Sequence, residues 1–557
     1  MGRTLLSRLG ELNPQLFREL KGRLTPAKLS VAAAISLGGQ LLLYAFLQAR
    51  LSVDSFCATS SPALRYRDAD IGGRAGQTAS ESAINWPLWW LDAFVALSAI
   101  GMGALLVVST YMLVADLARE ERRGTLAFVR HSPQSATTVL VGKLLGVPVL
   151  LYVAVLLALP LHLGAGMAAQ LPLGPIFGFY VALAASCAFF YSAALLWGLV
   201  GARWGHLPIW LGSGAVLLYW GTATANLLDL DAASVFPLVT ATPLDWLQLF
   251  YPGFALPYAV SEAPHSLETI GYLNIKDWAQ LQWFGQLFWQ APARGIGFML
   301  ANYAIGTVAI WSALKRRFDT PERPLASKPQ SYGIVGAFTL GALGFAVQMP
   351  GLEYRPVASF AMLFGLELLL FLGLIAALTP HRPTLQAWLR ARASRTRRPL
   401  AVALLWDDGS PAVGAIALGL AIASAAIGGS ALLLPLEGSR PVVLVGWFVT
   451  AGTILLAATL VQGLLLLRTR QRSRWATGAI AALVVLPVAS RVVGGPTALA
   501  LLLFPMPAIG AAPTITVFWT ILGQWTAIVL LNLGTVQQLK RAERSEFAAL
   551  QAERNAA

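Results

Sequence analysis

Long apolar stretches alternate with short polar segments along most of the 557-residue chain. A helix needs about 20 apolar residues to cross the hydrocarbon layer of a bilayer, and a helix in lipid satisfies its own backbone hydrogen bonds. The pattern therefore predicts an all-α fold, a polytopic membrane helix bundle of about twelve transmembrane helices. The predicted spans are residues 29–47, 87–114, 144–163, 172–200, 207–225, 292–313, 332–349, 356–378, 412–435, 441–467, 476–491 and 512–533.

The order of landmarks repeats weakly between the two halves of the chain. In each half a polar insert that ends near a Ser-Pro pair leads into a span, and a short basic turn follows later. We therefore predict two parallel six-helix repeats with a pathway between them. The apolar piece 497–510 contains two prolines and is too short to cross comfortably, so we expect it to be re-entrant or interfacial. The predicted segments are an N-terminal amphipathic helix in 1–28, a first bundle at 29–313, a linker at 314–331, a second bundle at 332–533 and a tail at 534–557.

Composition places the chain in the membrane class. Apolar residues make up 57% of it, charged residues 12%, and the mean hydropathy is +0.65, which excludes the large soluble classes. The net charge of +14 comes mainly from Lys and Arg on alternate connections. This distribution predicts a multi-pass protein of the cell (inner or plasma) membrane with both termini cytoplasmic, and no nucleic-acid partner.

Two segments outside the spans carry patterns of their own. Asn13 is suited to cap a helix that Pro14 begins, and Leu16, Phe17 and Leu20 share one face of it. We expect this helix to lie in the membrane interface, the alternative being a helix packed on a soluble partner. The loop 226–291 is acidic and aromatic, and either lies on the outer interface or packs a small core of its own.

The sequence offers no catalytic or metal motif. Gly142-Lys143 is followed by Leu144 and lacks the upstream glycine of a phosphate-binding loop. The five histidines are scattered, and Cys57 and Cys187 are predicted at different depths, so neither a metal site nor a disulfide is implied. We therefore predict that the chain is not an enzyme and holds no cofactor.

Two acidic residues are predicted at membrane depth, where ionisable groups are costly and often functional. Asp92 lies just inside the second span beside Trp89 and Trp90, and we favour a structural role for it. Glu367 lies in the middle of the eighth span. It should face the bundle interior and either line a pathway or join helices.

The polar insert 115–143 is more patterned than a simple connection requires. It contains a helical charge array, a Gly-Thr break at Gly124, a second apolar-periodic piece and a Ser-Pro break at Ser132. Its Glu-Arg-Arg-Gly-Thr segment, Ser-Pro turn and Gly-Lys pair resemble the permease subunit of a type-2 ATP-binding-cassette (ABC) exporter. The resemblance covers residues 13–313 well and implies that the insert docks on a separate ATPase subunit, which carries the ATP and Mg. The residues expected to couple the two subunits are Glu120, Glu121, Arg122, Gly124, Thr125, Phe128, Ser132, Pro133 and Lys143.

The chain departs from this family pattern by carrying two bundles, so a homodimer is not required. Its second insert, 379–411, keeps the Ser-Pro landmark without a Glu-Arg-x-Gly-Thr counterpart, and unequal docking is expected. Two other functions stay open. One is an ion-coupled carrier that uses Glu367. The other is a membrane-embedded enzyme acting on lipid-linked substrates through Asp229, Asp231 and Asp245.

Overall fold

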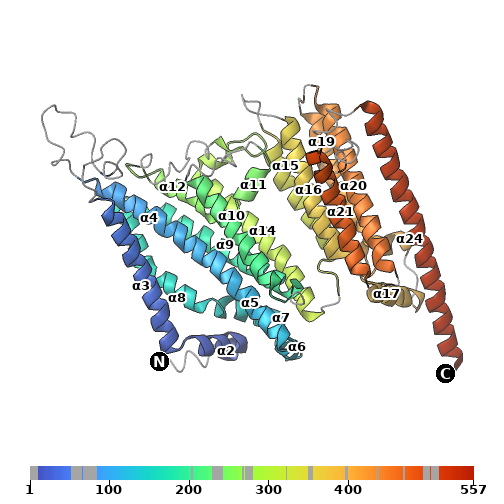
Figure 1. The fold of residues 1–557 in the computed structure, drawn as a ribbon, viewed down its shortest axis with the longest axis horizontal. Helices are drawn as coiled ribbons and strands as arrows, with labels where there is room; N and C mark the ends of the chain where they lie inside the picture. The colour runs from blue at the N-terminus through green and yellow to red at the C-terminus, as the bar shows by residue number, and fades with distance from the viewer. Residues whose placement is uncertain are drawn as a thin grey trace. The chain divides into compact units, whose positions relative to one another are not determined.

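The computed structural model describes residues 10–51, 66, 84–201, 205–228, 242–265, 269, 280–320, 323–348, 356–394, 399–434, 436, 438–467, 469, 471–493, 502 and 513–556. Apart from one isolated β-bridge, all regular structure within these residues is helical (Figure 1). Ten of the described helices are long and apolar enough to cross a membrane. They are α3 (Pro26–Ala49), the continuous run α4–η3–α5 (Trp86–Gly103, Ala104–Val108, Ser109–Arg122), α8 (Val149–Ala168), α9 (Leu173–Gly201), α14 (Pro292–Asp319), α16 (Pro356–Leu378), α19 (Val413–Leu433), α20 (Arg440–Leu466), α21 (Arg472–Val493) and α24 (Thr514–Ala556).

The chain is thus an all-helical, multi-pass membrane protein, with ten candidate spans at ten of the twelve predicted positions. The other two positions are also helical, as α10 (Leu207–Leu227) and α15 (Lys328–Ala346), but neither belongs to the ten. Gly, Ser, Thr and Asn lower the hydropathy of α10, and α15 begins with the polar segment Lys-Pro-Gln-Ser. These helices pack within their own units, α10 against α5 and α15 against α19.

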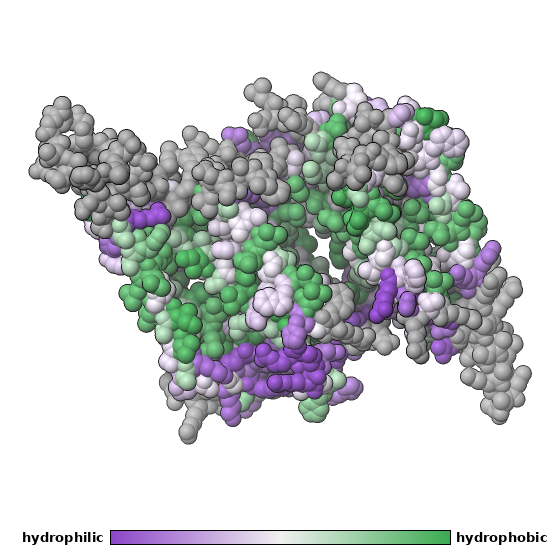
Figure 2. Space-filling model, viewed as in Figure 1, coloured by the Kyte–Doolittle hydropathy of each residue, from purple (hydrophilic) through white to green (hydrophobic). Residues whose placement is uncertain are grey.

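The described helices fall into two compact units. Unit 1 holds the helices from α2 (Pro14–Arg23) to α14, and its core lies where α5, α7 (Ala136–Gly146) and α9 meet around Leu113, Leu117, Leu140 and Leu195. Unit 2 holds α15 to α24, with α20 packed against α16, α19, α21 and α24. Apolar residues cover the long helices, while polar residues gather at the end of unit 1 where α2 and α6 lie (Figure 2).

The helix boundaries correct two predictions. The second span does not stop at 114 but continues to Arg122, so the first eight residues of the insert extend a transmembrane helix. The third span does not begin at 144, because α7 ends at Gly146 and α8 begins after Pro148. Proline lacks the amide hydrogen that a continuous helix would need. Most of the piece 497–510 lies outside the described residues.

The aromatic part of the loop 226–291 packs against the helix bundle of unit 1 and does not form a separate core. Its short helices η6 (Pro252–Ala255) and α12 (Leu256–Val260) pack against α9, and Tyr251 and Phe254 are buried. The Tyr251 hydroxyl is 2.7 Å from that of Thr224 on α10, and Tyr258 donates to the Trp289 carbonyl. This segment therefore folds back into the helix bundle of unit 1.

Candidate functional site

The polar insert is built as three helices separated by two breaks. Helix α5 ends at Arg122, and Gly124 adopts φ 70°, a left-handed conformation that favours glycine. The chain then forms the short α6 (Thr125–Arg130), and the Ser-Pro turn leads to α7, which the Ser135 side chain caps. Both breaks stand where the sequence predicted them.

The N-terminal helix α2 packs on α7 of the same chain. Asn13 caps α2 through the Leu16 amide, and its Nδ2 donates to the Thr138 carbonyl 2.9 Å away. A Cβ at Gly142 would lie 2.8 Å from the Leu16 amide nitrogen, and one at Gly146 would lie 2.5 Å from Glu19 Cβ. The pair Gly142 and Gly146, four residues apart, lets the two helices approach closely.

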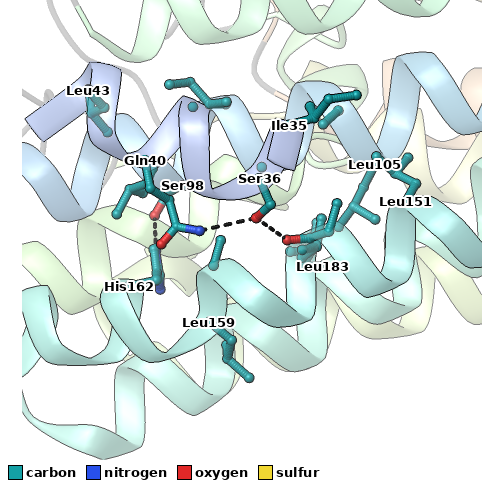
Figure 3. A pocket seen from close by; sticks show the side chains of 18 of the residues that line it. Ile35, Ser36, Gln40, Leu43, Ser98, Leu105, Leu151, Leu159, His162 and Leu183 are labelled. Carbon is teal, nitrogen blue, oxygen red and sulfur yellow. Dashed lines mark hydrogen bonds between the residues drawn. The ribbon is translucent and has the colours of Figure 1, made fainter. Parts of the chain in front are cut away.

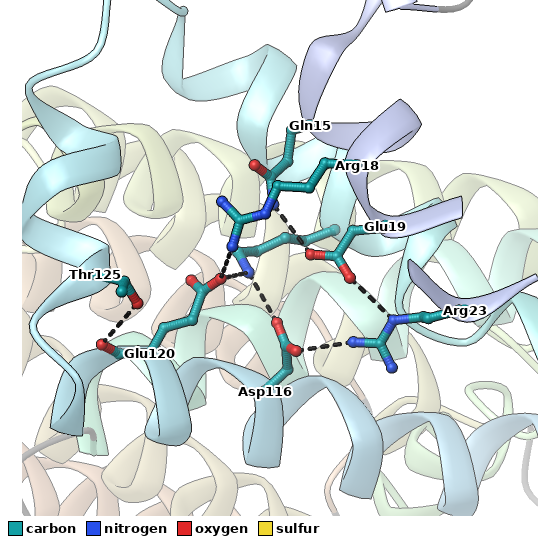
Figure 4. Close-up of polar contacts among 8 residues, drawn as sticks. Gln15, Arg18, Glu19, Arg23, Asp116, Glu120 and Thr125 are labelled. Carbon is teal, nitrogen blue, oxygen red and sulfur yellow. Dashed lines mark hydrogen bonds and ion pairs between the residues drawn. The ribbon is translucent and has the colours of Figure 1, made fainter. Parts of the chain in front are cut away.

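A charge cluster joins α2, α5 and α7 (Figure 4). Lys143 is fully buried, and its Nζ lies 2.8 Å from Asp116 Oδ2 and 2.8 Å from Glu120 Oε1. Arg23 lies 2.9 Å from Asp116 through Nη2 and 2.9 Å from Glu19 through Nε. We call these five residues the charge cluster. Each of the three helices supplies at least one charge, so the cluster fixes their ends together.

The two carboxylates favour the charged form of Lys143. Burial alone would lower the pKa of Lys143, but the carboxylates of Asp116 and Glu120 outweigh it and raise this pKa above its ordinary value. The oxygens of Glu19, Asp116 and Glu120 approach one another closely enough to hold a metal ion. Lys143 and Arg23 already supply the positive charge there, so the arrangement is a salt-bridge network rather than a metal site.

The predicted coupling residues divide into an inner and an outer group. Lys143 and Glu120 are buried in the charge cluster and hold the insert from within. Thr125 Oγ1 donates to the Glu120 carbonyl, and Ser132 Oγ donates to the Val129 carbonyl, so both stabilise the breaks around α6. The exposed positions are Arg122, Gly124, Thr125, Phe128 and Pro133, with Glu121 half-buried.

Phe128 is the most exposed apolar side chain of the insert. It is 80% exposed, whereas Leu126 and Val129 of the same short helix are buried in the core of unit 1. A large aromatic side chain held in water on a fixed helix is unfavourable unless something covers it. A polar groove of about 440 Å³ lies between α2 and the end of α5, lined by Arg18, Arg119, Arg123 and the carboxylates of the charge cluster.

The two acidic residues predicted at membrane depth differ in their surroundings. Asp92 is buried and accepts hydrogen bonds from the Tyr66 hydroxyl at 2.7 Å and from Thr269 Oγ1 at 2.9 Å. It therefore joins the N-terminal half of α4 to connecting segments of unit 1. Glu367 is also buried, on α16, and its carboxyl has no hydrogen-bond partner among the described residues, with the Thr339 hydroxyl of α15 nearby.

The second insert is also anchored by a buried lysine. Its described part contains α17 (Arg382–Ser394) and α18 (Leu400–Trp406). Lys328, at the start of α15, donates from Nζ to the carbonyls of Leu404 and Pro411 at 2.5 and 3.0 Å, and to Ser410 Oγ. Burial lowers the pKa of Lys328 to about 8, although Asp408 and Asp407 act in the opposite direction. We call Lys328 and these three partners the Lys328 site.

Only one of the three acids proposed for an enzymatic function, Asp245, lies within the described residues. Asp229 and Asp231 lie outside the described residues, and Asp245 is buried in α11 (Leu244–Gln248) rather than presented on a surface. Comparisons of the chain with protein families, with curated proteins and with solved structures found no match. Fold and site thus define a polytopic helical membrane protein with two lysine-anchored polar inserts.

Sequence reasoning missed three members of the charge cluster, Glu19, Arg23 and Asp116. Two signals pointed to them. Asp116 and Glu120 are four residues apart, as are Glu19 and Arg23, and such pairs share one helix face. The pair Gly142 and Gly146 also marks a surface prepared for close helix packing.

Proposed function

We propose that this chain is the membrane-spanning permease of an ATP-driven exporter, similar to the type-2 ABC class, with its two bundles fused in one chain. A separate ATPase would bind the insert 115–143 and supply ATP and Mg. Under this proposal both termini and both inserts are cytoplasmic, twelve helices form two six-helix repeats, and no second copy is needed.

The observation that carries the proposal is Phe128, exposed on a short helix that a buried charge cluster holds in place. Aromatic side chains that fill a pocket on a partner dominate many protein interfaces. Arg122, Arg123 and Glu121 around it supply polar contacts that set the specificity of docking.

The same geometry provides a route for movement. Helix α5 continues α4 through the π-helical turn η3, and the charge cluster joins α5 to α7 and α2. Only Leu24 and Thr25 separate α2 from α3. A push on α6 by a closing ATPase would therefore shift these helices as one body, because ion pairs and close-packed helices resist separation.

The test is co-expression with ABC ATPase subunits encoded in the same genome, followed by co-purification and an assay of ATP hydrolysis in lipid nanodiscs. We expect one ATPase to co-purify with the wild-type chain and Phe128→Asp to abolish the complex. The matched control is Leu12→Asp, since Leu12 is 79% exposed just before α2. Loss of the complex in both variants, or in neither, would contradict docking through α6.

A second candidate function is an ion-coupled carrier, favoured by Glu367. A buried carboxyl without a hydrogen-bond partner among the described residues is costly and suits a group that binds a proton or cation during transport. Collapse of the proton gradient with ATP maintained separates the two functions. Transport by the proposed exporter would continue, whereas transport by a Glu367-dependent carrier would stop.

A further inference from the structure

An apolar cavity of about 350 Å³ lies inside unit 1, between α3, α4, α8 and α9 (Figure 3). Its volume is in the range of pockets that hold small ligands. The lining residues of α3 run from Ile35 to Leu43, in the middle of that candidate span, and those of α8 run from Leu151 to His162. The cavity therefore belongs to the depth at which a bilayer is hydrocarbon.

Two glycines make the cavity by leaving space. Gly39 of α3 and Gly101 of α4 both line the cavity, and no atom of a neighbouring element lies within 4 Å of a Cβ placed on either. Glycines in membrane helices commonly serve close helix contacts, as Gly142 and Gly146 do here. Around Gly39 and Gly101 the neighbouring helices stay apart instead, and Ala104, Ala154 and Ala158 add further small side chains to the walls.

The polar groups at the cavity wall are already satisfied. Ser98 donates to the Phe94 carbonyl, so its oxygen accepts from His162 Nε2 at 2.7 Å. His162 Nδ1 then accepts from the Tyr180 hydroxyl at 2.6 Å. Gln40 donates to Ser36, and Ser36 donates to the Ala154 carbonyl. Among the described residues no charged side chain lines the cavity, so a charged headgroup would find no counterion there.

The wall also includes a local widening of the second span. Ala104 and Leu105 belong to the π-helical turn η3, a feature that interrupts the regular ladder of an α-helix and often occurs at functional sites. The buried Tyr191 hydroxyl donates to the Leu105 carbonyl and accepts from Ser109, which stabilises the turn. The irregular backbone is thus supported by dedicated side chains.

We propose that this cavity binds one acyl chain of a bilayer phospholipid. Hydrocarbon is the chemistry that fits, because the walls are apolar, the polar groups are paired and the depth excludes water. The acyl chain enters from the lipid beside α3, whose side chains Leu41 and Leu42 face outward. The bound acyl chain packs against α3 beside Gly39, where no protein side chain fills the space. This inference does not depend on the proposed export function.

The test is photolabelling of the full-length protein in phosphatidylcholine vesicles that contain a phosphatidylcholine with a diazirine in its acyl chain. We expect labels on the cavity-lining residues Leu43, Leu97 and Leu105 in addition to the outward-facing Leu41 and Leu42, which do not line the cavity. Gly39→Leu and Gly101→Leu should each lower cavity labelling by about tenfold, because a leucine side chain takes the space of the acyl chain. Labelling of Leu42 should stay unchanged.

Gly38→Leu is the matched control, since Gly38 is the neighbouring glycine, also has open space around it and does not line the cavity. It should leave cavity labelling intact. Thermal unfolding checks that the variants fold, and leucine is a better helix former than glycine. The proposal is overturned if wild-type labels appear on Leu41 and Leu42 alone, if folded Gly39→Leu and Gly101→Leu proteins keep full cavity labelling, or if a headgroup-labelled phosphatidylcholine labels the cavity equally.

Discussion

The two polar inserts are anchored by different chemistry. In unit 1 the insert is held by the charge cluster, in which Lys143 and Arg23 neutralise carboxylates from α2 and α5. In unit 2 Lys328 instead donates to the Leu404 carbonyl near the end of α18, to the Pro411 carbonyl and to Ser410 Oγ. The presented surfaces differ as well. Helix α6 exposes Phe128 among charges, whereas α18 exposes Leu400, Val402 and Trp406.

This difference indicates different tasks for the two anchors. The charge cluster joins three helices, so a force on α6 reaches all of them. The Lys328 site mainly closes the end of one short helix, since cations stabilise the last turn of a helix. Under the proposed function, unit 1 would transmit movement and unit 2 would hold a surface in place. We therefore expect substitutions at the two inserts to differ in how much stability they remove and how many helices they affect.

Removal of the Lys143 charge should have the largest effect. Lys143→Met leaves Asp116 and Glu120 side by side without their buried cation, and breaking a buried ion pair costs about 3–5 kcal/mol. Thermal unfolding in nanodiscs measures the loss. Lys21→Met, an exposed lysine of α2, is the control and should change stability little. Equal stability of the two variants would show that the charge cluster does not hold the insert.

Separation of α2 from α7 should come next. Gly146→Leu places a side chain where Cβ alone would lie 2.5 Å from Glu19 Cβ, and overpacking of this kind costs about 1–3 kcal/mol. The Arg23 ion pairs would break as α2 moves away, which distance measurements between spin labels on α2 and α7 would report. Gly164→Leu, in open space on α8, is the control. An unmoved α2 would contradict the packing role of Gly146.

Loss of the Lys328 amine should affect unit 2 alone. Lys328→Met leaves the Ser410 hydroxyl and the Pro411 carbonyl without this donor. The loss should lower the stability of unit 2 by about 1–3 kcal/mol. Hydrogen exchange of the α18 segment should rise, while exchange around α6 should stay as in the wild type. Faster exchange at α6 in this variant would mean that the two anchors are not independent.

The pH dependence of the two anchors should have opposite signs. The pKa of Lys328 is lowered to about 8, so from about pH 8 to the ordinary lysine value of about 10.4 the unfolded chain binds more protons and stability rises with pH. The pKa of Lys143 is raised, so its contribution is complete below the ordinary value and is lost as pH rises through the folded value. Comparing the pH dependence of unfolding in wild type and Lys328→Met isolates the first effect. A Lys328→Met curve identical to that of the wild type would contradict it.

Local features of this molecule follow from local sequence. The cap at Asn13, the left-handed turn at Gly124 and ten of the spans were predicted because each depends on neighbouring residues or on run length. The helices α10 and α15 are less apolar than the others, which explains why they are not among the ten candidate spans.

Contacts between residues far apart in the chain could not be predicted from the sequence. In the sequence Lys143 is only the second residue of a Gly-Lys pair. The packing of α2 and α5 around α7 shows that its side chain is buried between two carboxylates. The aromatic residues of 226–291 have a spacing that suits a membrane surface, yet Tyr251 is buried by α10. Gly39 and Gly142 look alike in sequence, although one borders a cavity and the other a helix contact.

The central claim is that α6 is the main docking site for a separate ATPase. Its most direct test is the Kd of the purified ATPase for the full chain in nanodiscs, measured for Phe128→Ala and, in the second insert, Trp406→Ala. Truncation of a central aromatic anchor costs about 2 kcal/mol or more, about 30-fold in Kd. We predict a loss of this size for Phe128→Ala and a smaller one for Trp406→Ala. An unchanged Kd for Phe128→Ala, or the larger loss at Trp406, would contradict the account.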